Sequence, residues 1–289
     1  MVTIRSYKPA DAAVLAAHFN ELCPVEQVTA WRLNGRLAAW SLSWVVCVAE
    51  QPVGYACAAP LPGLPGQYDL DVMIALAWQR QGLGSQLVAF LKQALAGSEV
   101  RSLNWGVTEN QSSVAAFLRR SGFTPEHEEL ILARPHLEDL PPAPLRPHLA
   151  IRTYARREAI ALFCRLYETA FAGLPWYQPY TLDEAAADLA AASDILFLAE
   201  GKRPFGFAWL HIDDTGEGKI EPIGLIPEKQ GRGNGRFLFI SALHTLKQRG
   251  ADRALIGAWT HNTAALNLYH SLGFNHQQTI AYYTCSLHS

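Results

Sequence analysis

The sequence predicts an α/β protein of two tandem domains, each a mixed sheet flanked by helices. Apolar residues switch repeatedly between the twofold period of strands and the period of three to four residues of helices. Landmarks recur at a constant offset: Gln230 follows Gln79 by 151 positions (230 minus 79), and Phe274 follows Phe123 by the same distance. The 289 residues suit two domains of about 100 to 200 residues each.

The first repeat alternates between strand-like and helix-like runs. A helix starts at Pro9, where proline fits the first turn, and the Gln51-Pro52 turn separates two strands. Strands are predicted at 2–7, 44–50, 53–59, 68–77 and 102–107, and the further helices at 25–39, from Gly84 to about 96, and from about 112 to 120.

The second repeat has the same order, beginning with a strand near residue 150. Its glycine-rich turn, Gln230–Gly235, precedes a run to about 249 in which apolar residues recur at threes and fours, so this run is a helix. Residues 134–147 are proline-rich and cannot continue a helix or a central strand. We therefore expect a first domain at 1–134, an extended linker at 135–147 and a second domain at 148–289.

Composition narrows the class of protein. A net charge of -2 and a pI near 6.5 give no reason to expect nucleic acid or an anionic membrane as partner. No apolar run approaches the roughly 20 residues of a membrane span, and the first residues lack the build of a signal peptide. The five cysteines have no metal-type spacing. We expect a cytoplasmic protein with reduced cysteines and no metal.

The glycine-rich turn between a strand and a helix predicts a phosphate site. Helix N-termini present unpaired N–H groups and a positive dipole end, and glycines let a phosphate approach them. Such turns occur in several nucleotide-binding folds, so the turn alone is a weak signal. Neither repeat has the Gly-Lys-Ser/Thr ending of a P-loop or the acidic residue of a dinucleotide fingerprint.

The full pattern is more specific. Each repeat has Gln-x-x-Gly-x-Gly after a strand, then a further strand and helix, and then Gly-Phe. This resembles the GCN5-related N-acetyltransferase (GNAT) superfamily over nearly the whole chain, as a tandem pair. The resemblance implies mostly antiparallel mixed sheets, acetyl-CoA as the acetyl donor and a small-molecule amine as acceptor, in a monomer or homodimer.

The resemblance also implies which residues bind the coenzyme. The diphosphate would lie on the turn, the pantetheine arm along the end of the preceding strand, and a backbone N–H near Leu225 would face the developing oxyanion, with Gly224 leaving room for the thioester. The expected coenzyme-binding residues are Ile223, Gly224, Leu225, Gln230, Gly231, Arg232, Gly233, Asn234, Gly235, Arg236, Asn262 and Ala265, with Met73, Ile74, Gln79, Gly82 and Gly84 in the first repeat.

Acetyl transfer to an amine needs a base and an acid. Tyr269, seven residues after Asn262 in the family's Asn-x-x-Ala-x-x-x-Tyr pattern, is the expected acid; the alternative is a packed aromatic ring. Glu221, on the strand before the turn, is the first candidate for the base, or else a solvated strand end. His261 and His211 are reserve candidates.

The first repeat departs from this pattern. Leu118 stands where Tyr269 stands in the second repeat, and a leucine cannot donate a proton. Asn110 is one position out of place, whereas the turn residues are kept. We expect the first domain to be degenerate in catalysis, although Asp69 and Asp71 remain possible bases.

The acceptor would meet the loop 171–180 of the second repeat. Its aromatic residues predict either a lid over a ring-bearing or partly apolar amine, or a loop packed against the other domain. The expected acceptor-binding residues are Trp176, Tyr177 and Tyr180. The leading hypothesis is an N-acetyltransferase acting through its second domain; the alternative is a non-catalytic acyl-CoA-binding protein. Retention of Tyr269 favours the enzyme.

Overall fold

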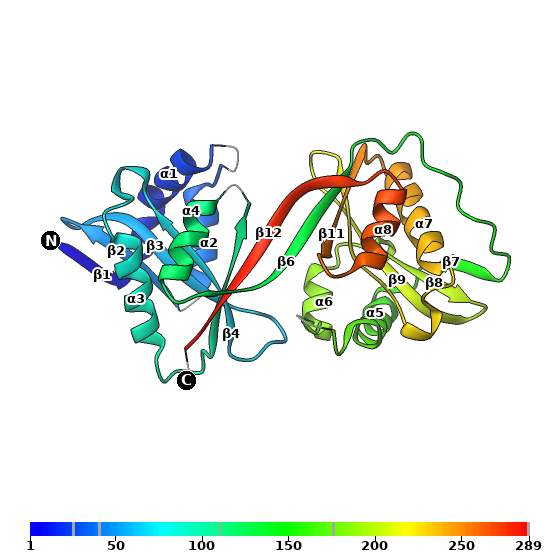
Figure 1. Ribbon diagram of the computed structural model, residues 1–289, viewed down its shortest axis with the longest axis horizontal. Coiled ribbons are helices and arrows are strands. Elements are labelled where there is room, and N and C mark those ends of the chain that lie inside the picture. Colours follow the sequence, from blue (N-terminus) through cyan, green and yellow to red (C-terminus); the bar gives the residue numbers. More distant parts are fainter. Residues whose placement is uncertain (25–26, 40–41, 110, 175–176, 288–289) are drawn as a thin grey trace. The chain divides into compact units, whose positions relative to one another are not determined.

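The computed structural model describes residues 1–24, 27–39, 42–109, 111–174 and 177–287. They form two compact units, one of Met1–Glu126 with Ala281–Ser289 and one of His127–Ile280 (Figure 1). Each unit is a mixed sheet with helices, so the predicted tandem α/β fold is confirmed.

The first unit has the sheet order β1-β2-β3-β4-β5, followed by the last residues of β12. The strands β1 to β4 pair antiparallel, and β4 and β5 pair parallel. The strands are β1 (Val2–Ser6), β2 (Ser43–Val48), β3 (Gln51–Pro60), β4 (Gln67–Ile74), β5 (Ser102–Thr108) and β12 (Asn275–Ser286), and the helices are α1 (Ala12–Leu22), α2 (Ala30–Ala39), α3 (Leu83–Leu95) and α4 (Ser112–Arg120).

The second unit repeats this arrangement, in the order β7-β8-β9-β10-β11-β6. Its parallel pair is β10 and β11, and the remaining described pairs are antiparallel. The strands are β6 (Thr124–Arg134), β7 (Leu149–Arg152), β8 (Ile195–Glu200), β9 (Arg203–Ile212), β10 (Glu217–Leu225) and β11 (Arg253–Trp259), and the helices are α5 (Arg156–Phe171), α6 (Leu182–Asp188), α7 (Asn234–Gln248) and α8 (Thr263–Ser271).

Alternating side chains of the central strands supply two hydrophobic cores in each unit. In β8, Phe197 packs with α5 and α6 on one face of the sheet, whereas Leu196 and Leu198 pack with α7 on the other. In the first unit, Val45 faces α1 and α2, and Val46 faces α3. This period of two is the expected signature of a strand with both faces covered.

The sequence analysis missed the strand that follows Gly-Phe in each repeat. Residues 127–134 of β6 belong to the second unit, where they pair with β11, and residues 281–286 of β12 belong to the first unit, next to β5. Leu132 is accordingly buried in the core of the second unit, and Tyr283 and Cys285 in the core of the first. The two repeats exchange their last strands.

The proline-rich segment 135–147 contains no helix or strand, as predicted, but it is packed on the second unit. Leu137 is 1 % exposed and lies in the core that α7 covers. The His244 ring contacts the Pro141 carbonyl oxygen at 3.0 Å, and Lys247 donates to the Glu138 carbonyl at 2.8 Å. The compact units therefore do not divide at this segment.

Several predicted boundaries differ from the structure, two of them with a consequence for the site or the core. The helix predicted at 25–39 begins at Ala30. The strand predicted at 68–77 ends at Ile74, because the N–H of Ala75 makes the last bond to Val53 and a 3-10 turn, Leu76–Trp78, follows.

Candidate functional site

The site begins where the parallel pair of each unit separates. β10 and β11 pair only over Glu217–Lys219 and Arg253–Leu255, and β4 and β5 pair only over Gln67–Asp69 and Ser102–Asn104. Beyond these residues, the inner edge of β10 and of β4 no longer faces a described partner strand. A separated parallel pair thus leaves backbone N–H and C=O groups available to a ligand.

The turn after β10 exposes the start of α7. Gly231 and Gly233 have φ of 71° and 76°, a left-handed conformation that favours glycine, and Gly233 is the N-cap of α7. The Gln230 side-chain amide donates to the Leu225 carbonyl at 3.0 Å, and that of Asn234 to the Lys229 carbonyl at 2.9 Å. These two amides fix the turn and leave the first N–H groups of α7 for an anion.

The other predicted turn residues share this location. Gly235 is the second residue of α7, and Arg236 donates from its guanidinium to the Ser271 hydroxyl at 2.8 Å. The Arg232 carbonyl accepts a hydrogen bond of 3.1 Å from Arg146, a residue of the proline-rich segment. The structure brings together all seven residues from Gln230 to Arg236 at one helix end.

The first repeat forms the same turn. The Gln79 side chain donates to the Ile74 carbonyl at 2.9 Å, and Gly82 caps α3 with φ of 82°. A cavity of about 350 Å³ lies on this turn, and its lining includes Ile74, Gln79, Gly82, Gly84 and Trp105. Met73, also expected at the coenzyme, has its side chain in the core under α1 and α2, with 6 % of its surface exposed.

The end of β10 presents two N–H groups to the side from which β11 has separated. Ile226 donates its N–H to Phe205 of β9, and N–H groups alternate in direction along a strand. Those of Ile223 and Leu225 therefore point away from β9. The space that a side chain at Gly224 would fill is occupied by the rings of Phe171 and Phe207, within 3.1 Å of an added Cβ.

Glu221 lies at an irregularity that the sequence analysis did not detect. The register of β10 against β9 shifts between Ile220 and Ile223, whereas β4 keeps one register against β3 from Tyr68 to Ile74. Such a bulge redirects side chains and interrupts the ladder. The Glu221 carboxylate lies 2.5 Å from the Lys219 ammonium, and both side chains are partly exposed.

Tyr269 lies on α8 and is buried, with 6 % of its surface exposed. Its ring centroid is 4.8 Å from that of Phe239 and 6.2 Å from that of Phe274. Burial raises the pKa of the Tyr269 hydroxyl, and the negative charge of Glu221 raises it further. The hydroxyl is therefore protonated at neutral pH, as a general acid must be.

The remaining residues of the family pattern position α8. Asn262 is the N-cap of this helix, and its side-chain oxygen accepts the N–H of Ala265 at 3.2 Å. Ala265 packs against the core that α7 covers. In the first repeat, Leu118 is fully buried at the position of Tyr269, and Asn110 lies outside the described residues.

The loop after α5 packs within its own unit. Tyr180 lies against Phe163, with 5.2 Å between ring centroids, and Tyr177 against Tyr167 at 5.8 Å; Trp176 lies outside the described residues. Burial raises the pKa of Tyr180 to about 12, with smaller contributions from carboxylates that include Glu221. The aromatic residues of this loop therefore lie close enough to Glu221 for its charge to influence the pKa of Tyr180.

Tyr167 is a site residue that the sequence analysis missed. It contacts the rings of Phe171 and Tyr180, both at 4.9 Å, and burial raises its pKa, with a smaller contribution from Glu221. The signal was present as an aromatic stripe at helical spacing, Phe163, Tyr167 and Phe171.

The two reserve bases have different surroundings. His211 stacks on Trp209 at 5.6 Å, and burial, followed by the positive charge of Lys219, lowers its pKa. A neutral imidazole is a competent proton acceptor. His261 precedes α8 and lies 3.3 Å from the Thr260 hydroxyl. Of the two, His211 is the one whose pKa is influenced by the charges of Lys219 and Glu221.

The second unit thus combines an anion-binding helix end, free strand-end N–H groups, a protonated tyrosine and a carboxylate. Acyl transfer from a phosphate-bearing thioester can use each of these groups. None of the helices in the described part of the chain is long and apolar enough to cross a membrane.

Comparison with known proteins agrees with this geometry. The model of the acetyltransferase (GNAT) family matches twice, at residues 14–123 and 160–274. The chain is 35 % identical to a mycothiol acetyltransferase of Tsukamurella paurometabola over 250 residues, covering 79 % of this chain and 82 % of that protein. It is 31 % identical to the mycothiol acetyltransferase of Mycobacterium ulcerans over 302 residues, covering 94 % and 91 %.

Solved structures share the fold over the whole chain. A GCN5-related N-acetyltransferase from Sphaerobacter thermophilus superposes with a TM-score of 0.73 at 19 % identity, covering 99 % of this chain and 96 % of that chain. A tandem GNAT protein from the clavulanic acid biosynthesis pathway gives 0.71 at 13 % identity, covering 100 % and 99 %. The chain therefore belongs to the GNAT family, with two copies of the fold in tandem, and is an N-acetyltransferase.

Proposed function

We propose that the second repeat transfers the acetyl group of acetyl-CoA to a primary amine of a small molecule by direct attack on the thioester. The observation that carries this proposal is the difference between the repeats at one location. In the second repeat, β10 has a register shift beside Glu221 and α8 carries Tyr269; in the first repeat, β4 has an unbroken register and α4 carries Leu118. Only the second repeat combines a candidate base with a candidate acid.

The turn of the second repeat fits the coenzyme. Gln230 is folded back onto Leu225, and Gly231 and Gly233 carry no side chain, so the backbone N–H groups at the start of α7 suit the diphosphate. The edge of β10 suits the amide groups of the pantetheine arm, which pair like a strand. When bound, acetyl-CoA supplies the acetyl group and a thiolate leaving group.

Each remaining step belongs to a residue of this chain. The Leu225 N–H stabilises negative charge on the carbonyl oxygen, a kind of contact whose removal typically raises a barrier by about 3 to 4 kcal/mol. The Tyr269 hydroxyl donates its proton to the leaving sulfur. Glu221, which forms an ion pair with Lys219, accepts the proton that the ammonium of the acceptor releases.

The aromatic surface of Tyr167, Tyr177 and Tyr180 suits an acceptor with an apolar or ring-shaped body. The relatives are named mycothiol acetyltransferases, so an amine related to mycothiol is the first acceptor to assay.

The test is release of free thiol from acetyl-CoA with a panel of amines. We expect turnover with at least one small primary amine and a loss of about 100-fold or more in kcat for Glu221→Gln. Asp214→Asn, an exposed residue of the β9–β10 turn, is the matched control and is expected to match wild type. Turnover that survives in Glu221→Gln but is lost in His211→Gln would reassign the base to His211.

For the first repeat, we propose coenzyme binding without turnover. The cavity of about 350 Å³ on its turn and the bond from Gln79 to Ile74 support binding, and Leu118 removes the acid. Calorimetry with CoA tests this: two sites per chain are expected, and a single site whose affinity is weakened by Gly233→Ala would contradict it.

A further inference from the structure

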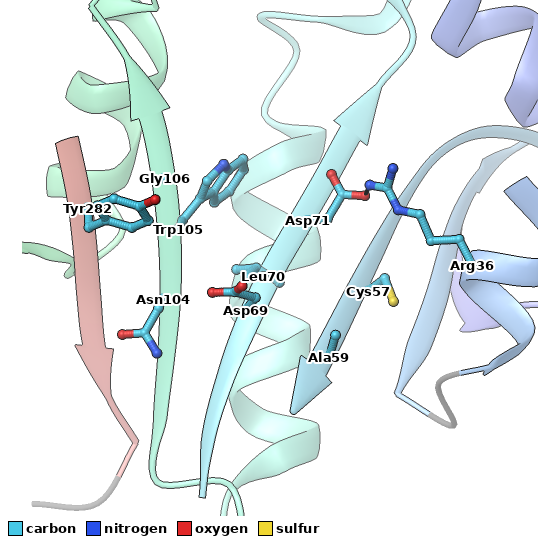
Figure 2. A pocket seen from close by; sticks show the side chains of 10 residues that line it. All are labelled: Arg36, Cys57, Ala59, Asp69, Leu70, Asp71, Asn104, Trp105, Gly106 and Tyr282. Carbon is cyan, nitrogen blue, oxygen red and sulfur yellow. Dashed lines mark hydrogen bonds and ion pairs between the residues drawn. The ribbon is translucent and has the colours of Figure 1, made fainter. Parts of the chain in front are cut away.

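A second cavity of the first unit is not explained by coenzyme binding. It measures about 360 Å³ and lies where β4 and β5 separate (Figure 2). Its polar lining consists of Asp69 and Asp71 of β4, Arg36 of α2, Cys57 of β3, Asn104 of β5 and Tyr282 of β12. Trp105 lines both this cavity and the cavity on the glycine-rich turn, so the two cavities adjoin.

The two carboxylates of this cavity have different surroundings. Asp71 forms an ion pair with Arg36, and Figure 2 shows these two side chains directed toward each other. Asp69 points to the opposite side, toward β5, and its side chain makes no hydrogen bond or ion pair with any residue that the structure describes. Partial desolvation raises the pKa of the Asp69 carboxyl, and no cation among the described residues pairs with it. The Asp69 side chain is exposed, so a bound cation can reach its carboxylate and pair with it.

The other lining groups suit an organic cation rather than a bare ion. Asn104 is 6 % exposed, and among the described residues its amide makes a single long hydrogen bond, 3.5 Å, to the Tyr68 carbonyl. The rings of Trp105 and Tyr282 border the same space in Figure 2. Aromatic faces attract alkylammonium groups, and an amide supplies a hydrogen-bond partner for a polar substituent.

This negative charge is specific to the first repeat. Gly54 of β3 and Gly206 of β9 occupy equivalent positions, so Ala59 of β3 corresponds to His211 of β9. Their partners across the sheet, Asp69 and Lys219, therefore also correspond. A lysine thus replaces Asp69 in the second repeat, where it is paired with Glu221. The unpaired carboxylate is not a feature that the two repeats share.

We propose that the first repeat binds a small organic ammonium ion at Asp69 and does not acylate it. The ammonium group pairs with the Asp69 carboxylate, and its organic part lies against Trp105 and Tyr282. This repeat has an unbroken β4 and Leu118, so it lacks the base arrangement and the acid of the second repeat. The site is independent of the chemistry proposed for the second repeat.

The test is a titration of the full chain followed through the indole N–H resonance of Trp105 in two-dimensional NMR. The probes are ethanolamine and D-glucosamine, with ethylene glycol and D-glucose as uncharged counterparts, in the presence of CoA to occupy the turns. Saturable shifts are expected with the two ammonium probes only. Asp69→Asn, which keeps the shape of the side chain, is expected to raise the dissociation constant of the ammonium probes about tenfold or more. Asp214→Asn is the control and is expected to leave it unchanged.

Trp105 lies in the first unit, so an amine bound beside Glu221 does not produce this signal. Equal shifts with charged and uncharged probes would overturn the proposal, as would unchanged affinity in a folded Asp69→Asn protein. Asp69→Lys is a second variant that mimics the second repeat, and it is expected to abolish the shift. Should Asp69→Asn fail to fold, binding of ammonium probes to Asp69→Lys would itself overturn the proposal.

Discussion

Tyr269 is the residue on which the proposed chemistry depends most directly. Replacing it with phenylalanine keeps the contacts with Phe239 and Phe274 and removes only the proton donor. We expect Tyr269→Phe to lower kcat about 100-fold or more, with little change in KM for acetyl-CoA. Tyr283→Phe, a buried tyrosine of the first unit, is the control and is expected to leave kcat unchanged.

The pH profile separates this role from a structural one. The pKa of the Tyr269 hydroxyl is raised, so the acid form is present throughout the neutral range and is lost only above the usual tyrosine value of about 10. Wild-type kcat is thus expected to show no decrease caused by this residue between neutral pH and about 10. A decrease near pH 8 that disappears in Tyr269→Phe would show that the hydroxyl is not held protonated.

Arg80 and Gly231 occupy the same position in the two turns, and both have positive φ, 61° and 71°. This conformation costs a side-chain-bearing residue about 1 kcal/mol, whereas glycine adopts it freely. Arg80→Gly is therefore expected to stabilise the first unit by up to about 1 kcal/mol, and Gly231→Ala to destabilise the second by a similar amount. Denaturant unfolding measures both, and stabilisation by Gly231→Ala would contradict the backbone argument.

Among the elements, the turn before α7 contains two glycines with different roles. Gly233 has φ of 76°, and an added Cβ would come within 2.6 Å of the Arg146 guanidinium. Gly235 lies inside the helix, where an added Cβ would make ordinary contacts of 3.8 Å with Leu225. Gly233→Ala is thus expected to raise KM for acetyl-CoA about tenfold, and Gly235→Ala to keep KM and to stabilise α7 by about 0.5 to 1 kcal/mol. Equal effects of the two variants would contradict this assignment.

The turns and their helices were predictable because glycine, glutamine and a helical period are local signals. The bulge in β10 could not be predicted, because the offset between the two repeats conceals the extra residue. β3 and β9 correspond at an offset of 152 (206 minus 54), β4 and β10 begin at 150 (219 minus 69), and after the bulge the offset is 151 (225 minus 74). The extra residue in β10 is hidden by differences in loop length. Register depends on the partner strand, which a single strand's pattern does not specify.

At the level of the whole molecule, the tandem fold followed from the repeat, but the exchanged strands did not. The alternation of apolar residues identifies a strand without naming the sheet that it joins. Leu132 and Cys285 fit a buried position in either unit by sequence, and only the structure assigns Leu132 to the second and Cys285 to the first. The proline-rich segment was interpreted as a linker for the same reason, because its contacts with α7 are made through scattered residues such as Leu137.

The exchange predicts how the chain can be divided. A fragment cut at the proline-rich segment, 148–289, lacks residues 127–134 of β6 and the buried Leu137, so β11 becomes an unprotected edge strand. The fragment 127–280 keeps both. We expect 127–280 to unfold cooperatively with a clear thermal midpoint, and 148–289 to aggregate or to melt without a transition, as measured by circular dichroism and size-exclusion chromatography. The loss of one buried leucine alone costs about 2 to 3 kcal/mol, and the lost strand adds to it. Equal stability of the two fragments would show that β6 and the segment 135–147 are dispensable for the second unit.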